Sequence, residues 1–186
     1  MPSGGSYVSN FASILFGLAV GEILIDFHRL LRSKHRVTWH WLPLFIAFYA
    51  LMSIISSWWE FYTELLPIQR LSIAAFLPSV VTMTFMFLIA AAALPDRVEE
   101  PIDLKQFYFE NARYLWRLYA LYIVWIVIRR SLIVSPGFHP GLIIIAGLHI
   151  SAMIYLSCTR RPLVHYVLPP LMLAQLLSVW LSFTVG

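Results

Sequence analysis

The chain has 186 residues, of which 60% are hydrophobic and only 12% are charged. A soluble domain contains about 45–50% apolar and about 25% charged residues, so this composition excludes an ordinary soluble protein. The net charge is +4, and the Lys and Arg residues lie between the apolar runs instead of forming a continuous patch. This distribution argues against a nucleic-acid partner. We predict an integral membrane protein whose partner is the lipid bilayer. Its only cysteine, Cys158, leaves no internal disulfide.

Six apolar stretches follow one another along the chain, and each is close to the roughly 20 residues that cross a bilayer as a helix. They cover residues 10–31, 40–62, 71–94, 114–132, 140–158 and 163–185. No stretch alternates apolar and polar residues, so the fold class is all-α. We predict a single transmembrane domain over 1–186, formed by a six-helix bundle. The N-terminal residues lack a basic region and a cleavage site, so we expect no cleaved signal peptide.

Two further features concern how the six helices connect. Residues 95–113 form the only long connection, in which Asp103 and Gln106 have the spacing of a helix capping box. We therefore predict that the fourth helix begins near Leu104, outside the bilayer, and continues through it. Leu-Pro pairs at Pro78 and Pro169 occupy matching places in the third and sixth stretches. They leave open an alternative description of the bundle as two inverted three-helix halves.

The Lys and Arg residues are distributed unequally between the two ends of the predicted bundle. Ten of the 13 belong to the connections after the first, third and fifth stretches: Arg29, Arg32, Lys34, Arg36, Arg97, Lys105, Arg113, Arg117, Arg160 and Arg161. Basic residues favour the cytoplasmic side, so we expect both termini outside the cell. Tryptophans fall at both predicted boundaries, as in an aromatic belt: Trp39, Trp41 and Trp116 inside, and Trp58, Trp59 and Trp180 outside.

The first stretch carries charges within its apolar sequence. Glu22, Asp26 and Arg29 are spaced i, i+4 and i+7, so they share one helix face. A charge facing lipid is costly, and we expect both carboxylates to face the bundle interior, with Arg29 and Arg32 as paired charges. The stripe then has two main interpretations, a pathway for protons or small cations or a structural stripe that docks helices. A contact with lipid headgroups or another subunit is a third.

Depth along the helices identifies partners for the stripe. His149 and Gln175 fall near the depth of Glu22, as do Tyr49, Ser53, Thr82 and Thr84. A proton pathway would combine Glu22, Asp26, His149 and Gln175. His149 is the leading candidate to contact Glu22. One turn away, Gly17 and Gly21 form a G-x-x-x-G pair, which predicts close packing on a helix of this chain or of a second copy. A homo-oligomer is expected.

Other residues indicate weaker possibilities. His28, His40 and His165 gather at the predicted cytoplasmic side, where two imidazoles on facing helices could hold a haem. The alternative is that they are solvated interfacial histidines, and our expectation is that there is no cofactor. Glu60, at the end of the second stretch, is interpreted as interfacial. We find no metal-binding or catalytic motif, and no lysine inside a stretch that could carry retinal.

Three segments resemble a group of small, uncharacterised bacterial inner-membrane proteins: RLLRSKHRVTWHW, SSWWEFY and ALPDRVEEPIDLKQFYFENARYLW. The resemblance covers about the first two thirds of the chain and implies a bacterial inner-membrane location, but no activity. The residues themselves favour a small channel or a proton- or cation-coupled transporter. One alternative is a non-catalytic membrane subunit or sensor whose acidic stripe docks helices, and another is a haem- or quinone-linked redox protein.

Overall fold

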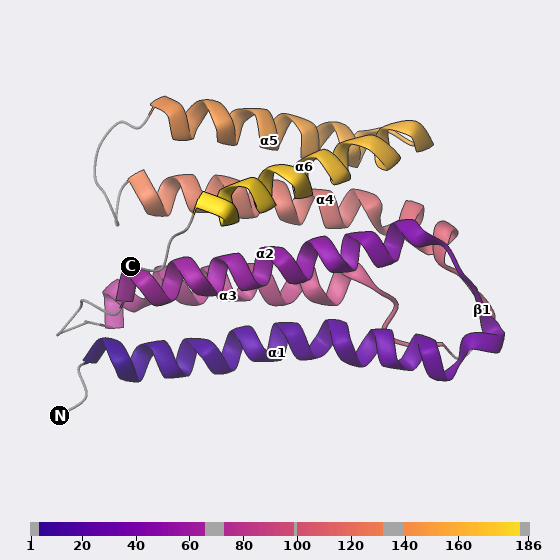
Figure 1. Cartoon of the computed structure of the whole chain (residues 1–186), viewed down its shortest axis with the longest axis horizontal. Coiled ribbons are helices and arrows are strands. Elements are labelled where there is room, and N and C mark those ends of the chain that lie inside the picture. Colours follow the sequence, from indigo (N-terminus) through magenta and orange to yellow (C-terminus); the bar gives the residue numbers. More distant parts are fainter. Residues whose placement is uncertain (1–3, 66–72, 99, 132–139, 183–186) are drawn as a thin grey trace.

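The computed structural model describes residues 4–65, 73–98, 100–131 and 140–182. These residues form six α-helices that run side by side along one axis (Figure 1), which confirms the all-α bundle. The helices are α1 (Gly4–Arg32), α2 (Trp41–Leu65), α3 (Ile73–Ala93), α4 (Leu104–Arg129), α5 (Pro140–Cys158) and α6 (Pro162–Ser182).

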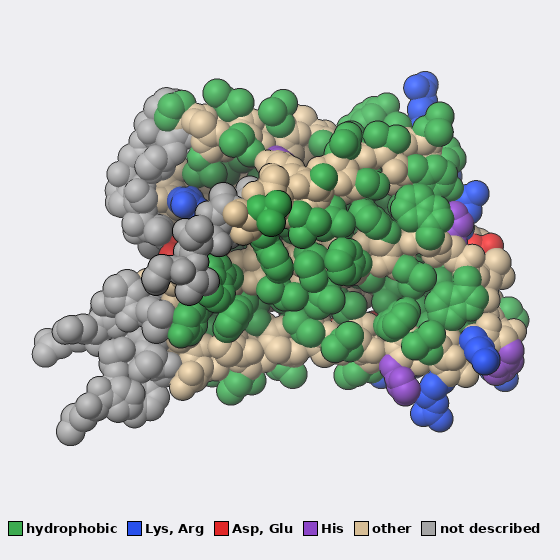
Figure 2. Space-filling view, viewed as in Figure 1, with side chains coloured by type: hydrophobic (Ala, Val, Ile, Leu, Met, Phe, Trp, Pro, Cys, Tyr) green, Lys and Arg blue, Asp and Glu red, His purple; other side chains and the backbone are tan. Residues whose placement is uncertain are grey.

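Four of the helices are long and apolar enough to cross a membrane. These segments are Val8–Arg32, Trp41–Glu64, Phe76–Ala93 and Pro140–Cys158. Helix α4 is not among them, since Lys105, Glu110, Arg113 and Arg117 make its first half polar. The apolar segment of α6, Pro162–Ser178, is shorter. Figure 2 shows hydrophobic side chains along the flank of the bundle and basic side chains gathered at one end, a pattern that fits a membrane protein.

The two halves of the chain pack differently. Helices α1, α2 and α3 each pack against the other two, as Figure 1 shows. In the second half, α4 packs along α5 and also against α3, whereas α6 contacts α2 and α5. An inverted repeat would give both halves the same packing, so the structure lends that alternative no support.

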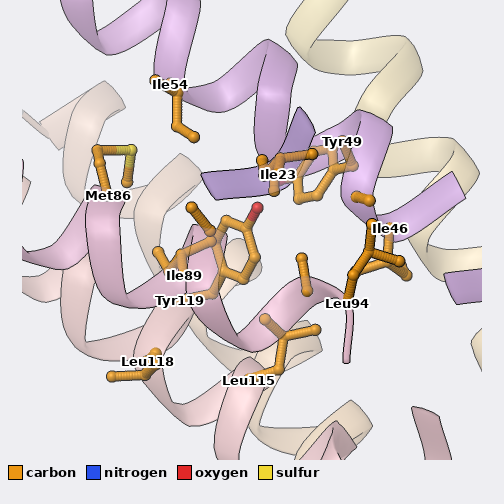
Figure 3. Packing of buried hydrophobic residues seen from close by; sticks show 14 of the residues in the cluster. Ile23, Ile46, Tyr49, Ile54, Met86, Ile89, Leu94, Leu115, Leu118 and Tyr119 are labelled. Carbon is orange, nitrogen blue, oxygen red and sulfur yellow. The ribbon is translucent and has the colours of Figure 1, made fainter. Parts of the chain in front are cut away.

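One contiguous cluster of buried apolar side chains draws members from all six helices. Figure 3 shows part of it, where Ile23, Ile46, Ile54 and Ile89 surround the ring of Tyr119. Lipid tails are as apolar as these side chains, so in a membrane such a core stabilises the bundle mainly through van der Waals packing.

Three tryptophans join neighbouring helices by donating their indole N–H to a hydroxyl oxygen. The pairs are Trp58 to Ser13 at 3.0 Å (α2 to α1), Trp125 to Thr82 at 3.0 Å (α4 to α3), and Trp180 to Ser56 (α6 to α2). Trp116 differs from a belt residue as well, because its side chain is fully buried. By contrast, Trp39 and Trp41 are 39% and 47% exposed, as residues of an aromatic belt should be.

Helix α4 begins at Leu104 and continues without a break, as predicted. The Asp103 carboxylate caps it by accepting hydrogen bonds from the backbone N–H groups of Lys105 (2.8 Å) and Gln106 (3.1 Å). The second half of the predicted capping box is absent, because the Gln106 amide donates instead to Glu110 at 2.8 Å.

Two short strands at the same end of the bundle were not predicted. Strand β1 (Val37–Thr38) precedes α2, and β2 (Ile102–Asp103) precedes α4. They pair in parallel, with Val37 opposite Ile102 and Thr38 opposite Asp103. Two-residue strands carry too little pattern to be seen in the sequence, yet this pair fixes the connection after α1 to the connection after α3.

Candidate functional site

Three of the four residues of the predicted proton pathway line two separate cavities, and Asp26 lines neither. Glu22 lines the first, the charged notch, whose volume is about 700 Å³ and whose lining is Glu22, Arg29, Arg32, Ser33, Asp96, Arg97 and Val98. His149 and Gln175 line the second, the central cavity, of about 290 Å³. Helices α1 and α5 lie on opposite sides of the bundle (Figure 1). The predicted contact between Glu22 and His149 is therefore wrong: equal depth along two helices does not make their side chains face each other.

Asp26 is the buried member of the acidic stripe. Its side chain has no exposed surface, and its Oδ1 accepts a hydrogen bond from Arg29 Nη1 at 2.9 Å. The same nitrogen donates to the backbone carbonyl of Asp96, just beyond α3, at 3.0 Å. Asp26 Oδ2 has no hydrogen-bond partner among the described residues. The ionic partner of Asp26 thus comes from its own helix, not from a second one, and Arg29 ties this helix to the connection that follows α3.

The glycine pair beside the stripe does not pack as predicted within the chain. A Cβ atom added to Gly17 or to Gly21 would meet no atom within 4 Å. Gly17 instead borders a groove of about 310 Å³ between α1 and α2, together with Ser13, Phe16, Val20, Ile54, Ile55 and Trp58. No helix described in this chain uses the close approach that these glycines permit.

The central cavity is enclosed by four helices, and each contributes a different chemistry. Helix α2 supplies hydroxyls and a carboxylate, α4 supplies phenols and two isoleucines, and α5 and α6 supply mainly apolar side chains with one imidazole and one amide. The lining residues are Tyr49, Ser53, Ser56, Ser57 and Glu60; Tyr119, Tyr122, Ile123 and Ile126; Leu142, Ile145 and His149; and Met172, Gln175 and Leu176.

A polar face on α2 forms one wall of this cavity. Ser53 and Ser57 donate their hydroxyl hydrogens to the backbone carbonyls four residues earlier, at 2.9 Å in both cases. A carbonyl can only accept, so the hydroxyl of Tyr122 is the donor in its 2.8 Å contact with Ser57 Oγ. This pattern leaves an oxygen lone pair of Tyr122 available to accept a hydrogen bond, whereas Ser53 has the hydroxyls of Tyr49 and Tyr119 as hydrogen-bonding neighbours.

Tyr119 brings a buried hydroxyl that lacks a hydrogen bond. Its side chain is 1% exposed, and its ring lies beside that of Tyr49 (Figure 3), with 5.3 Å between the two centroids. The centroid of the Trp116 ring lies 5.6 Å away. The hydroxyl makes no hydrogen bond of normal geometry with any described residue, although Ser53 is a polar neighbour. Buried hydroxyls are nearly always satisfied, so an open one beside a cavity indicates a place for a ligand or water.

Glu60 is the acidic residue of the central cavity. Two arginines at the C-terminal end of α4, Arg130 and Arg129, act electrostatically on Glu60, and Arg129 also forms a two-point ion pair with Glu64 at 2.6 and 3.3 Å. Glu60 makes no ion pair with any cation that the structure describes. We had interpreted it as interfacial because it ends an apolar stretch beside two tryptophans. A helical spacing could have revealed it, because Tyr49, Ser53, Ser57 and Glu60 follow one another at intervals of 4, 4 and 3 residues.

His149 faces the same cavity from α5. Its Nδ1 lies 2.8 Å from the carbonyl oxygen of Ile145, and a carbonyl only accepts, so Nδ1 carries a hydrogen. Nε2 is then the nitrogen that can take up or release a proton. Gln175 on α6 adds an amide with both donor and acceptor atoms.

His165 belongs to a separate network at the basic end of the bundle. Its Nε2 donates to the Thr159 carbonyl at 3.1 Å, and its Nδ1 lies 2.7 Å from the hydroxyl of Tyr108. Trp116 donates its indole N–H to the same hydroxyl at 3.0 Å. Burial raises the pKa of Tyr108, so this hydroxyl stays protonated and donates to His165. Every polar atom of the network then has a partner when the imidazole is neutral.

This network is incompatible with the haem hypothesis for His165. Both ring nitrogens are hydrogen-bonded inside the protein, so neither is free to bind iron. His40 uses its Nδ1 to accept the backbone N–H of Leu42 at 3.2 Å, and its ring stacks on those of Trp41 and Tyr166. His28 is exposed on α1, on the far side of the bundle from α6 in Figure 1.

A helical bundle in which four helices are long and apolar enough to cross a membrane is consistent with a membrane protein. No protein-family model, curated protein or solved structure matches this chain.

Proposed function

We propose that this chain moves protons or small cations across a membrane, as a coupled transporter or a channel, and that the central cavity is its binding site. The observation that supports this most directly is the carboxylate of Glu60 in one cavity with the imidazole of His149, between helices of an apolar bundle. Ionisable groups inside membrane bundles are costly, and those that occur usually serve ion or proton pathways.

In this proposal Glu60 is the residue that binds the ion. Without an ion pair to a described cation, its carboxylate can take a proton or a cation in exchange. From Tyr49 to Glu60 the polar face of α2 extends about 16 Å at 1.5 Å per residue, roughly half the hydrocarbon thickness. The hydroxyls along it and Nε2 of His149 would carry protons toward the middle of the bilayer.

The proposed placement in the membrane has six crossings, with α4 entering near Tyr114 and both termini outside a bacterial inner membrane. The gathering of Lys and Arg at one end of the bundle supports it (Figure 2). So do the exposed Trp39 and Trp41 at that same end. The polar first half of α4 would then lie in the cytoplasm, next to the paired strands.

A second candidate function is a non-catalytic membrane subunit or sensor, in which the acidic stripe only holds helices together. The contact of Arg29 with both Asp26 and the Asp96 carbonyl favours this role for the stripe itself. The unused glycine face of α1 would then receive a partner helix or a second copy of the chain.

Proton flux into liposomes tests the transport proposal. Purified protein is reconstituted with a pH-sensitive dye inside, and a potassium gradient with valinomycin sets the membrane potential. We expect potential-driven acidification with the wild type and its loss with Glu60→Gln, which keeps shape and removes the charge. Glu22→Gln is the matched control and should retain flux. Wild-type flux equal to that of empty liposomes would reject transport. Loss of flux in Glu22→Gln but not in Glu60→Gln would show that the pathway uses the acidic stripe of α1 and not the central cavity.

A further inference from the structure

The size of the central cavity narrows the class of ligand it can take. The volume of the central cavity is about 290 Å³. That is at the lower end of the range for small-molecule sites. A bare metal ion would need several oxygen or nitrogen ligands converging on one point. Among the described residues, no three His, Cys, Asp or Glu side chains gather in this way.

The two sides of the cavity differ in polarity. Helix α2 presents Ser53, Ser57 and Glu60, whereas the opposite helices present mainly Leu142, Ile145, Met172 and Leu176. A ligand that matches both sides of the cavity has a charged group to interact with the polar side and an apolar group to pack against the apolar side. The single carboxylate in the lining requires that charged group to be positive.

The aromatic residues of the cavity point to the same charge. Phenol rings attract cations through their faces, and Tyr49, Tyr119 and Tyr122 all contribute to the lining. The oxygen of Tyr122 retains a lone pair for an N–H donor, and the buried hydroxyl of Tyr119 makes no hydrogen bond of normal geometry with any described residue. An ammonium group bears several N–H donors and could engage these oxygens while paired with Glu60.

We propose that the central cavity binds a small amphiphilic organic ammonium ion, with its nitrogen against Glu60 and its apolar part between α5 and α6. The inference rests on the proposed function, because it makes the Glu60 carboxylate the group that binds either the proton or the ammonium ion. A site that holds either one but not both would couple the movement of the two in opposite directions.

Binding can be measured without any gradient, by equilibrium dialysis of the protein in lipid nanodiscs with empty nanodiscs as the blank. The probes are benzylammonium and cyclohexylammonium, with benzyl alcohol as the neutral analogue. We expect saturable binding of at least one ammonium probe, at least tenfold tighter than that of the alcohol. Equal affinity for benzyl alcohol, or no saturable binding of either ammonium ion, would overturn the inference.

Four variants locate the site. Glu60→Gln should weaken ammonium binding at least tenfold, and Glu60→Asp, which keeps the charge, should weaken it less. Tyr119→Phe should weaken it several-fold, whereas Tyr155→Phe, at an exposed tyrosine of α5, should leave it unchanged. Unaltered binding to Glu60→Gln would place the probe elsewhere and refute the assignment. Glu60-dependent proton flux without ammonium binding would reject this inference alone, and binding without flux would reject the proposed function alone.

Discussion

Arg129 on α4 and Glu64 on α2 form a two-point ion pair, with Nη1–Oε2 and Nη2–Oε1 distances of 2.6 and 3.3 Å. The arginine side chain is 7% exposed and the glutamate side chain 24% exposed, so the pair is largely shielded from solvent. It fastens the ends of two helices that also enclose the central cavity. Arg129 and its neighbour Arg130 both act electrostatically on Glu60, but the ion pair that Arg129 forms among the described residues is with Glu64.

Glu64→Gln should destabilise the protein strongly, because it leaves the guanidinium of Arg129 buried and unpaired. Removing one partner of a buried pair costs about 3–5 kcal/mol, and the partial exposure of Glu64 favours the lower end, about 3 kcal/mol. Thermal unfolding in detergent, followed by circular dichroism, measures the change. Arg130→Gln, at an exposed neighbour, is the control and should have little effect. Equal melting temperatures for Glu64→Gln and wild type would show that the pair is not stabilising.

Arg29→Ala tests the acidic stripe as a structural anchor. It would leave the Asp26 carboxylate buried without a partner, and an unsatisfied buried polar group costs about 1–3 kcal/mol. The double variant Asp26→Leu with Arg29→Ala should regain most of that loss, since it removes the buried charge as well. Arg32→Ala, in the same notch, is the matched control. If the single and double variants melt alike, the pair contributes no stability.

Tyr108→Phe removes one hydroxyl that serves two buried partners, His165 and Trp116. Two unsatisfied groups should together cost about 2–4 kcal/mol of stability. Tyr114→Phe, at a residue that is 52% exposed, should cost almost nothing. Chemical denaturation in detergent compares the two, and equal stabilities would show that the network is dispensable.

The same residue predicts an alkaline effect. Burial raises the pKa of Tyr108 in the folded protein above its ordinary value of 10.0, so the unfolded chain loses this proton first as pH rises. The stability tied to the protonated hydroxyl is complete below pH 10 and decreases above it. Wild type should therefore lose more stability than Tyr108→Phe between pH 9 and about pH 11, measured as the shift in melting temperature. A parallel decline in both proteins would contradict this assignment.

Gly17→Leu tests whether α1 joins two copies of the chain. An added Cβ at Gly17 meets no atom within 4 Å and the residue borders a groove, so we expect Gly17→Leu to fold, while the larger side chain would block close approach of a second helix. We expect wild type to form an oligomer in detergent, by light scattering after gel filtration, and Gly17→Leu to be monomeric. Gly147→Leu on α5, where an added Cβ is equally free of contacts, is the control. A wild-type monomer would remove the oligomer from the proposal.

Topology can be tested with fusions to the C-terminus. We expect the C-terminus to lie outside the cytoplasm, where fused alkaline phosphatase is active and a fused fluorescent protein is dark. The opposite result would mean that the orientation of the bundle is reversed and that its basic end does not face the cytoplasm.

Features set by local sequence could be predicted, and those set by helix rotation could not. The start of α4 depends on Asp103 and two neighbouring backbone N–H groups, all within four residues, so spacing alone reveals it. The helical class and the spans of the apolar helices follow equally from composition and length. The partner of Glu22 depends on how α1 and α5 are turned and placed around the bundle axis, and depth carries no information about either.

The composition of the central cavity was only partly accessible for the same reason. The predicted depths of His149, Gln175, Tyr49, Ser53, Thr82 and Thr84 agree, and the first four line one cavity, whereas Thr82 and Thr84 do not line it. The carboxylate of that cavity was misassigned, because an acidic residue in the middle of an apolar run is conspicuous and Glu60, at the end of one, is not. The ion pair between Arg129 and Glu64 joins residues 65 positions apart, so no local sequence pattern predicts it.

The parallel pairing of β1 with β2 has a consequence for the order of assembly. Val37 and Ile102 are separated in the chain by both α2 and α3, so in the proposed topology their hydrogen bonds form only after those two helices have been inserted and have returned the chain to the side it left. Closing so long a loop is entropically unfavourable until the intervening helices bring its ends together. The strand pair would then form late in biogenesis. The helix that starts at Leu104, directly after β2, would pack against the bundle only once the first three helices are in place.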